Sequence, residues 1–314
     1  MNAKRKLMLT GAQGFVAGSI LAQAGDDSEV HAVSRQAEPV EPPGRSPRQG
    51  GRAKRHWHVC DPLAAAQLAQ LFREVRPDVV IHSAALADID YCQTHPELAR
   101  AVNVELTRNL AELCAESGAR LIFCSTDTIF DGEHAPYREE DPPGPVNLYA
   151  ETKVQAEQIV NRLGAQAVIA RLALVVGLPV LGSGNSFLIR MLGAFKEGHT
   201  VGMSEHEIRT PVDVITVGRA LLELAASNHR GIFHLSGLSR VSRLELARTV
   251  AGRFGFPREL VVAQSAAAAP GRAARPRDVS LDNRKARETL RTLMRTLDEG
   301  ISLILESEHA RARA

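Results

Sequence analysis

Short apolar segments alternate with amphipathic segments through the first half of the chain. Strands are predicted at 6–10, 29–34, 79–82, 120–124 and 167–172, and helices at 15–24, 63–75, 97–117 and 149–163. The strand segments are rich in β-branched and other apolar residues, which is typical of strands buried on both faces. This alternation predicts an α/β fold in which helices cover both faces of a doubly wound parallel sheet.

The alternation weakens after residue 172. Helices are predicted at 185–196, 213–227, 242–254 and 283–307, and one strand at 231–235. We therefore expect a first domain over residues 1–171 and a smaller, mixed α/β lobe over 172–314, with a part near 210–235 returning to the first domain. Two irregular stretches, 36–55 and 131–146, interrupt the pattern with proline and glycine.

The composition excludes several classes of partner. The formal net charge of the 314 residues is +2, and no basic motif interleaved with aromatic residues is present, so nucleic acid is not expected as a partner. The apolar run at Leu7–Leu9 ends in Thr10–Gly11, which is too short for a signal peptide or a membrane span. Cys60, Cys92, Cys114 and Cys124 show no metal or disulfide spacing and are expected to be reduced thiols. A cytoplasmic protein without membrane contact is predicted.

Gly11 and Gly14 lie between the first predicted strand and the first predicted helix. In that context Gly11 permits a tight turn, and Gly14 lets the backbone approach a pyrophosphate held at the helix N-terminus. Ala17 occupies the third position of the motif, where a small residue allows close packing of helix and strand. The segment predicts a dinucleotide site, although a purely structural turn has the same local pattern.

Arg35 follows the second strand, where a carboxylate would bind a free ribose 2′-hydroxyl. An arginine at this point can pair with a 2′-phosphate. We therefore expect NADPH to be preferred, with NADH still usable. The alternative is a solvated arginine at the start of a loop.

Tyr149 and Lys153 are four residues apart and share one face of a predicted helix. Reduction of a carbonyl needs a hydride on carbon and a proton on oxygen, and the Tyr149 phenol can supply the proton. The charge of Lys153 is expected to bring the phenol pKa closer to neutrality. Thr126, at the end of the strand predicted at 120–124, is expected to donate a hydrogen bond to the substrate oxygen.

Six segments resemble the extended short-chain dehydrogenase/reductases, and among these the dTDP-4-dehydrorhamnose reductase group. They are 9–14, 77–85, 125–132, 147–153, 233–237 and 275–282. The resemblance spans nearly the whole chain. It implies a Rossmann domain that binds the dinucleotide, a lobe that binds substrate, and reduction of the 4-keto group of a nucleotide-linked deoxy sugar, with Thr126, Tyr149 and Lys153 as the catalytic residues.

The predicted binding residues follow from these motifs and from the resemblance. The cofactor set is Gly11, Gln13, Gly14, Phe15, Val16, Ser34, Arg35, Asp61, Pro62, Ser83, Ala84, Ala85, Asn103, Tyr149, Lys153 and Leu172. The substrate set is Asp88, Thr126, Asp127, Thr128, Tyr149, Leu174 and Arg209. Thr128 and Leu174 stand where sugar reductases of the group usually carry Tyr and Trp. The identity of the sugar is therefore open.

Two alternatives remain beside the reductase. A sugar-nucleotide epimerase would keep its cofactor through the reaction, whereas a dehydratase lacks its usual base because Thr128 follows Asp127. The regulatory beta subunit of methionine adenosyltransferase looks like this group and acts by binding a partner. The oligomeric state is also open, with a homodimer as one option. No metal site is predicted, and His56 and His58, which flank Trp57, are interpreted as a strand edge.

Overall fold

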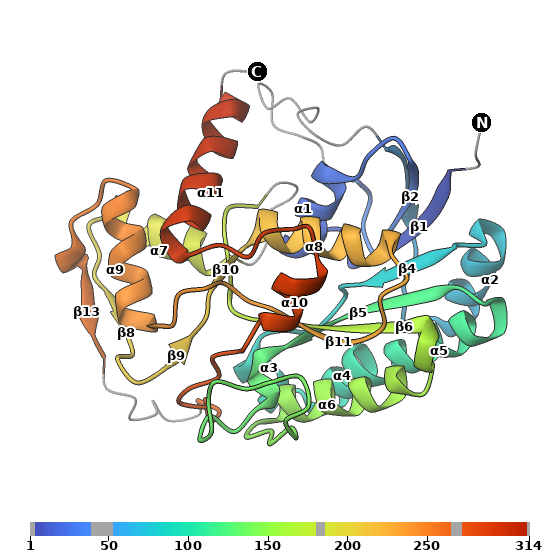
Figure 1. Cartoon of the computed structure of the whole chain (residues 1–314), viewed down its shortest axis with the longest axis horizontal. Coiled ribbons are helices and arrows are strands. Elements are labelled where there is room, and N and C mark those ends of the chain that lie inside the picture. The colour runs from blue at the N-terminus through green and yellow to red at the C-terminus, as the bar shows by residue number, and fades with distance from the viewer. Residues whose placement is uncertain (1–3, 39–52, 180–185, 265–271, 313–314) are drawn as a thin grey trace.

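A computed structural model describes residues 4–38, 53–179, 186–264 and 272–312 of the chain. Seven parallel strands form one sheet in the order β11-β6-β5-β4-β1-β2-β3 (Figure 1). They are β1 (Arg5–Thr10), β2 (Ser28–Ser34), β3 (Lys54–Val59), β4 (Val79–His82), β5 (Arg120–Thr126), β6 (Ala167–Leu172) and β11 (Gly231–Leu235). The strand order reverses between β1 and β4, which is where ligands bind in doubly wound sheets.

Helices cover both faces of the sheet, as Figure 1 shows. On one face lie α1 (Phe15–Gln23), α8 (Val214–Ala226) and the short α10 (Arg284–Thr289). On the other lie α2 (Ala65–Val75), α5 (Leu106–Ser117) and α6 (Leu148–Asn161), with α3 (Ile89–Thr94) and α4 (Pro96–Arg100) beside α6. The predicted doubly wound α/β fold is confirmed.

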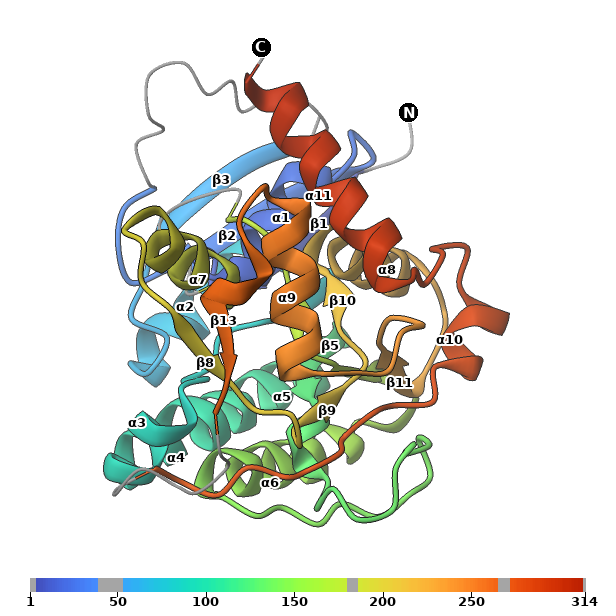
Figure 2. The same cartoon turned by 90° about the vertical axis from the view of Figure 1, so that its left-hand side faces the viewer.

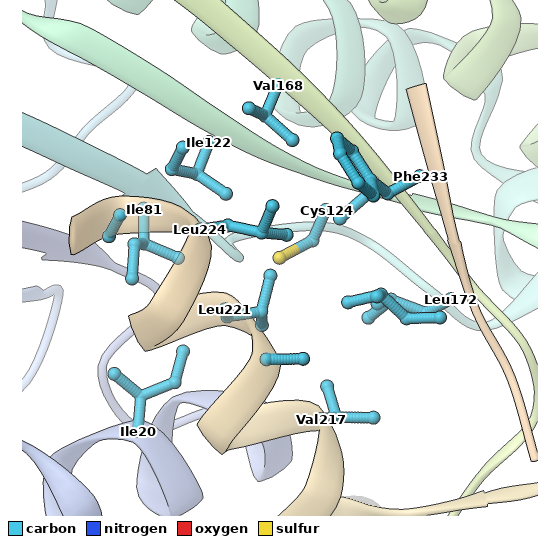
Figure 3. Close-up of a cluster of buried hydrophobic side chains, with 14 of the residues drawn as sticks. Ile20, Ile81, Ile122, Cys124, Val168, Leu172, Val217, Leu221, Leu224 and Phe233 are labelled. Carbon is cyan, nitrogen blue, oxygen red and sulfur yellow. The ribbon is translucent and has the colours of Figure 1, made fainter. Parts of the chain in front are cut away.

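The largest core lies between the sheet and the α1–α8 layer. Figure 3 shows Val217, Leu221 and Leu224 of α8 packed against side chains from the central strands, with Ile20 of α1 beside them. Helix α8 therefore covers the first domain, although it follows that domain's last predicted strand by some forty residues. All four cysteines are free and buried, as expected of reduced thiols.

A smaller lobe has its own core around Leu188, Phe195, Leu246 and Ile301. It contains α7 (Phe187–Lys196), α9 (Arg243–Arg253) and α11 (Leu297–Ala312), which lie together in Figure 2. Its short strand pairs are β8 (Val201–Met203) with β13 (Val261–Ala263) and β9 (Ile208–Arg209) with β12 (Val241–Ser242). A third pair, β7 (Val175–Val176) with β10 (Val212–Asp213), connects the lobe to the sheet domain.

The helix predicted at 283–307 is wrong as a single element. It is divided into α10 and α11, because the Glu223 carboxylate accepts the backbone N–H groups of Arg291 and Thr292, which lie in a bend between the two helices. Helix α11 then begins at a capping box, in which Thr296 and Glu299 exchange hydrogen bonds. The Thr-x-x-Glu pattern is visible in the sequence and indicates a helix N-terminus, so the start of α11 could have been predicted.

The helix predicted at 97–117 is also interrupted. A π-helical turn at Ala101–Glu105 separates α4 from α5. Most of the irregular segment at 36–55 lies outside the described residues, and β3 begins at Lys54.

Candidate active site

The turn between β1 and α1 is closed against the end of β4. Gly11 has a φ of +71°, and a Cβ at that position would lie 2.7 Å from the Ala84 Cα. The Gly14 N–H donates to the Gly11 carbonyl at 2.7 Å, and the Ser83 hydroxyl donates to the Thr10 carbonyl at 2.8 Å. Both the left-handed backbone and the close approach require glycine at position 11.

Helix α1 begins at Phe15 with its N-terminus uncovered by side chains. Gly14 is the N-cap and supplies no side-chain hydrogen bond, and the first turn holds no acidic residue. The orphan N–H groups and the helix dipole there favour an anion. The turn therefore fits the pyrophosphate of a dinucleotide in backbone shape and in charge.

A cavity of about 560 Å³ lies between the sheet domain and the smaller lobe. We call it the interlobe cavity. Of the residues predicted from the sequence, it brings together Gly14, Phe15, Val16, Ser83, Ala85, Asp88, Thr126, Asp127, Thr128, Tyr149, Leu172, Leu174 and Arg209. The lining thus joins the first turn of α1 to the end of β5 and the start of α6.

Tyr149 stands in the first turn of α6 and lines the interlobe cavity. The helix starts here because the Asn147 side chain accepts the N–H of Ala150 at 2.9 Å. Burial raises the pKa of Tyr149, and the Thr126 hydroxyl opposes that shift as a hydrogen-bond partner. The prediction that Lys153 brings this pKa toward neutrality is therefore wrong for this structure. Tyr149 is a protonated phenol over the physiological pH range.

Lys153 is buried one turn further along α6. Its Nζ donates to the Cys124 carbonyl at 2.7 Å and lies 4.0 Å from the centre of the Phe123 ring. Burial lowers the pKa of Lys153 to about 8, because the charged form loses hydration. The ammonium is directed at the end of β5 and is not part of the cavity lining.

Thr126, Asp127 and Thr128 form a hydrogen-bonded turn at the end of β5. The Thr126 hydroxyl accepts the Thr128 N–H at 3.2 Å and donates to one Asp127 carboxylate oxygen at 3.2 Å. The other oxygen, Oδ2, is buried without a hydrogen-bond partner. Burial raises the pKa of Asp127 to about 6, and the Arg209 charge opposes the shift. A carboxyl group that titrates near neutrality therefore lies beside the phenol.

Asn103 does not line the cavity but holds two of its walls. Its amide accepts the Leu86 N–H at 2.8 Å and donates to the Leu86 carbonyl at 3.1 Å and to the Thr152 hydroxyl at 3.0 Å. The residue lies in the π-helical turn, a distortion that often marks functional sites. Its predicted cofactor contact is replaced by a positioning role between the β4 loop and α6.

The predicted residues that follow β2 and β3 lie at the C-terminal ends of the parallel strands, as the glycine turn does. They do not line the interlobe cavity. Arg35 is exposed directly after β2. Ser34 is buried, and its hydroxyl accepts the Gln36 N–H. Asp61 accepts the Leu63 N–H at 3.1 Å and precedes Pro62, while Gln13 donates to the Ala37 carbonyl.

The smaller lobe supplies the other wall of the cavity. Arg209 is buried, and its guanidinium donates to the carbonyls of Ile208, Pro276 and Arg277. Asp88 caps α3 by accepting the Tyr91 N–H at 2.9 Å and lines the cavity from the sheet domain. Leu174 adds an apolar side chain to the lining.

Three further charged residues of the lining were missed in the sequence: Glu207, Arg243 and Arg275. Arg243 lies over the Phe187 ring, and burial lowers its pKa to about 10, so it stays cationic at neutral pH. Arg275 forms a two-pronged ion pair with Asp90 at 2.8 Å. Arg275 opens a segment that resembles the family, which was the available signal. No sequence signal identified Arg243, because a position at the start of a helix does not indicate which distant residues the side chain contacts.

A family model described as the RmlD substrate binding domain matches residues 5–309. The chain belongs to this family. The resemblance to the dTDP-4-dehydrorhamnose reductase group of short-chain dehydrogenase/reductases is thereby confirmed.

Two curated relatives of different function match at similar identity. The beta subunit of methionine adenosyltransferase 2 from Bos taurus is 30% identical over 283 residues, which cover 88% of this chain and 80% of that protein. The dTDP-4-dehydrorhamnose reductase of Mycobacterium tuberculosis is 30% identical over 287 residues, which cover 89% of this chain and 86% of that protein.

Solved structures show the same fold. The Bacillus anthracis dTDP-4-dehydrorhamnose reductase in complex with NADP superposes with a TM-score of 0.84 at 23% identity, over 97% of this chain and 100% of that one. MoeE5 in complex with UDP-glucuronic acid and NAD superposes with a TM-score of 0.79 at 23% identity, over 97% and 99% of the two chains. Within the described residues, no helix of the RmlD-family chain has the length and apolar character to cross a membrane.

Proposed function

We propose that the chain is a reductase that uses NADPH to reduce a keto group of a nucleotide-linked sugar. The observation that carries this proposal is the shared cavity of Tyr149, Thr126 and the uncovered N-terminus of α1. The proton donor and the anion site thus face one space. The reductase relative, which matches 89% of the chain, supports the same activity.

The chemistry divides between the dinucleotide and the chain. A reduced nicotinamide, when bound, supplies the hydride that reaches the carbonyl carbon. The Tyr149 phenol, protonated because burial raises its pKa, donates a hydrogen bond and then its proton to the carbonyl oxygen. Thr126 hydrogen-bonds the phenol and the substrate oxygen and so positions the two groups relative to each other. Lys153, one helical turn away, donates to the Cys124 carbonyl and so holds the end of β5, which carries Thr126, against α6.

The preference for NADPH rests on Arg35. Its side chain is exposed at the end of β2, beside the turn that fits the pyrophosphate. A guanidinium at this position attracts a 2′-phosphate, and Arg35 stands directly after the strand, where a carboxylate would accept a 2′-hydroxyl. A ratio of kcat/KM values that favours NADPH is the expected outcome.

The substrate class rests on the basic wall of the interlobe cavity. Arg209, Arg243 and Arg275 bring three cations into the lining that also holds Tyr149, beside the carboxylates of Glu207 and Asp88. Guanidinium groups are well suited to the phosphates of a nucleotide diphosphate. The sugar then reaches Tyr149, and Thr128 and Leu174 leave room beside it. We also propose that residues 1–171, with a part near 210–235, form the dinucleotide-binding domain and that the rest mainly binds substrate.

The proposed function is tested by NADPH consumption against a panel of nucleotide-linked 4-keto sugars. At least one member should be reduced. Tyr149→Phe should lower kcat by about 100- to 10,000-fold, the usual contribution of a general acid, while the NADPH dissociation constant stays within about twofold. A native protein that binds NADPH and consumes none with any ketone would contradict the proposal.

A second candidate function is regulation without catalysis. It is favoured by the match of the bovine beta subunit to 88% of the chain. Stable co-purification with a methionine adenosyltransferase catalytic chain, combined with no NADPH consumption, would select it over the reductase. The Tyr149→Phe variant would then bind the partner as well as the native chain does.

A further inference from the structure

A cluster of histidines lies on β2 and β3, away from the interlobe cavity. Strand register pairs His31 with His56 and Glu29 with Lys54, so these side chains share one face of the sheet. His58 lies two residues beyond His56 on the same face. Strand β3 is the edge of the sheet, as Figure 2 shows, and the cluster is open on that side.

Three atoms of the cluster converge. The Glu29 carboxylate lies 2.6 Å from the His56 Nε2 and 3.9 Å from the His31 Nε2. All three ligand atoms lie within 4.8 Å of one another, the one group of this kind in the described part of the chain. Both Nε2 atoms are buried, and neither has a hydrogen bond of acceptable geometry. The short contact between Glu29 and His56 is an ion pair when the imidazole is protonated, and a metal ion would take the place of that proton between oxygen and nitrogen.

His58 fixes the orientation of His31. The His31 Nδ1 lies 3.0 Å from the His58 Nε2, so the Nδ1–H of His31 can be donated to His58. The Nε2 of His31 then carries the lone pair toward Glu29 and His56. A hydrogen bond to the second ring nitrogen of a ligating imidazole fixes its tautomer and its orientation in metal sites.

We propose that Glu29, His31 and His56 bind a divalent metal ion such as Zn²⁺. Two imidazole nitrogens and one carboxylate oxygen are a donor set that Zn²⁺ accepts, with water completing the coordination. The His31 side chain is buried, whereas those of His56 and Glu29 are 33% and 23% exposed, which leaves an entry path. The bound ion would tie the edge strand β3 to β2.

The surrounding charges are compatible with a bound cation. Lys54 approaches Glu29 at 3.6 Å, but its side chain is 65% exposed and is free to turn into solvent. Lys6 on β1 lies near His31, and Glu74 on α2 lies near His58. The site revises the expectation that these histidines form only a strand edge.

The test is titration of the full chain with Zn²⁺ alone, followed by calorimetry or by competition with a chromogenic chelator. One ion per chain is expected, and Zn²⁺ should raise Tm. His56→Gln and His31→Gln should each weaken binding by at least about tenfold, and His58→Phe by about 10- to 100-fold. His199→Gln is the matched control, since His199 is 70% exposed beside Glu197 and has no second imidazole.

Because His31 is buried, its variant risks misfolding, and His56→Gln keeps the test decisive. Co²⁺ offers a second readout, since its visible absorption reports nitrogen and oxygen coordination and should be lost with His56. Equal Zn²⁺ affinity in native and His56→Gln protein, or no stoichiometric binding to the native chain, would overturn the proposal. NADPH consumption is expected to be the same with and without Zn²⁺, which separates this test from that of the proposed function.

Discussion

Asp127 is a buried carboxyl group at the candidate active site, and its ionisation lowers the stability of the fold. Its carboxyl group is 3% exposed, and one of its oxygens has no hydrogen-bond partner. Burial raises its pKa from 3.8 to about 6, because water no longer solvates the charge. Perturbed carboxyl groups of this kind concentrate where substrates bind.

The raised pKa of Asp127 predicts a pH-dependent effect of Asp127→Asn. The folded protein holds the proton more tightly than the unfolded chain, so the favourable contribution is complete below about pH 4 and is lost as the pH rises through about 6. An amide cannot ionise. Relative to the native chain, the variant should therefore gain up to about 3 kcal/mol in free energy of unfolding between about pH 4 and pH 7. Urea unfolding at the two pH values measures this difference.

Asp90→Asn is the control with opposite sign. The ion pair with Arg275 lowers the pKa of Asp90, so the native carboxylate stabilises the fold above its unfolded pKa. That variant should lose stability relative to the native chain as the pH rises through the acid range to about 4, with little further change up to pH 7, so its unfolding is also measured below pH 4. A parallel pH response of the two variants would contradict the assigned environments.

At the scale of elements, the turn between β1 and α1 combines two independent demands. The backbone at Gly11 is left-handed, and the position of a Cβ is taken by the backbone of Ala84. Other residues could adopt the left-handed backbone at a moderate cost in free energy. No residue with a Cβ fits beside the Ala84 backbone. The turn is therefore held in place by the loop after β4, a contact between segments some seventy residues apart.

Gly11→Ala and Gly118→Ala separate the two demands. Gly118 ends α5 with a φ of +78°, and a Cβ there meets nothing within 4 Å. Gly118→Ala should cost about 1 kcal/mol, from the left-handed backbone alone. Gly11→Ala pays the same cost and also forces β4 and β1 apart, so we expect a loss above about 2 kcal/mol and much weaker NADPH binding. Chemical unfolding and fluorescence titration of NADPH measure the two effects.

Equal destabilisation by the two substitutions would show that Ala84 moves aside without cost. The same result with NADPH binding intact would remove the turn from the proposed cofactor site.

At the scale of the whole molecule, the site exists because two lobes close on one cavity. Asp90 of α3 holds Arg275, and it also accepts the Ala273 N–H at 2.9 Å. The late segment of the chain is thereby fixed against the sheet domain. The cations of the smaller lobe face Tyr149 and Thr126 across the cavity as a result.

This arrangement predicts a selective effect of Arg243→Gln. Arg243 lines the cavity from α9, far from the α1 turn in the sequence, and stays cationic at neutral pH. If it binds a substrate phosphate, its loss should raise the substrate KM by at least about tenfold, since charged hydrogen bonds contribute about 1.5–3 kcal/mol. The NADPH KM should be unchanged. Steady-state kinetics with each reactant varied in turn makes the measurement, with Arg248→Gln on the same helix as control.

A rise in both KM values would point to a collapse of the lobe. No change in either would remove Arg243 from the proposed substrate site.

The sequence by itself determined the ranges of six of the seven sheet strands, most helices, the glycine turn and the family, whereas no range was predicted for β3. These follow from periodicity and turn chemistry, which depend on residues close together in the chain. The strands at 79–82, 167–172 and 231–235 are confirmed to the residue. The break between α10 and α11 was missed because it depends on Glu223, a residue of another helix.

Only the tertiary structure decided the convergence of distant groups. Lys153 is directed at the Cys124 carbonyl, Arg243 and Arg275 enter the cavity, and Glu29 meets His56 across a strand pair. Each of these contacts depends on how strands are ordered and how the lobes close. A side chain's neighbours and its burial, which set its pKa and its chemistry, are properties of the packed chain, and no local pattern encodes them.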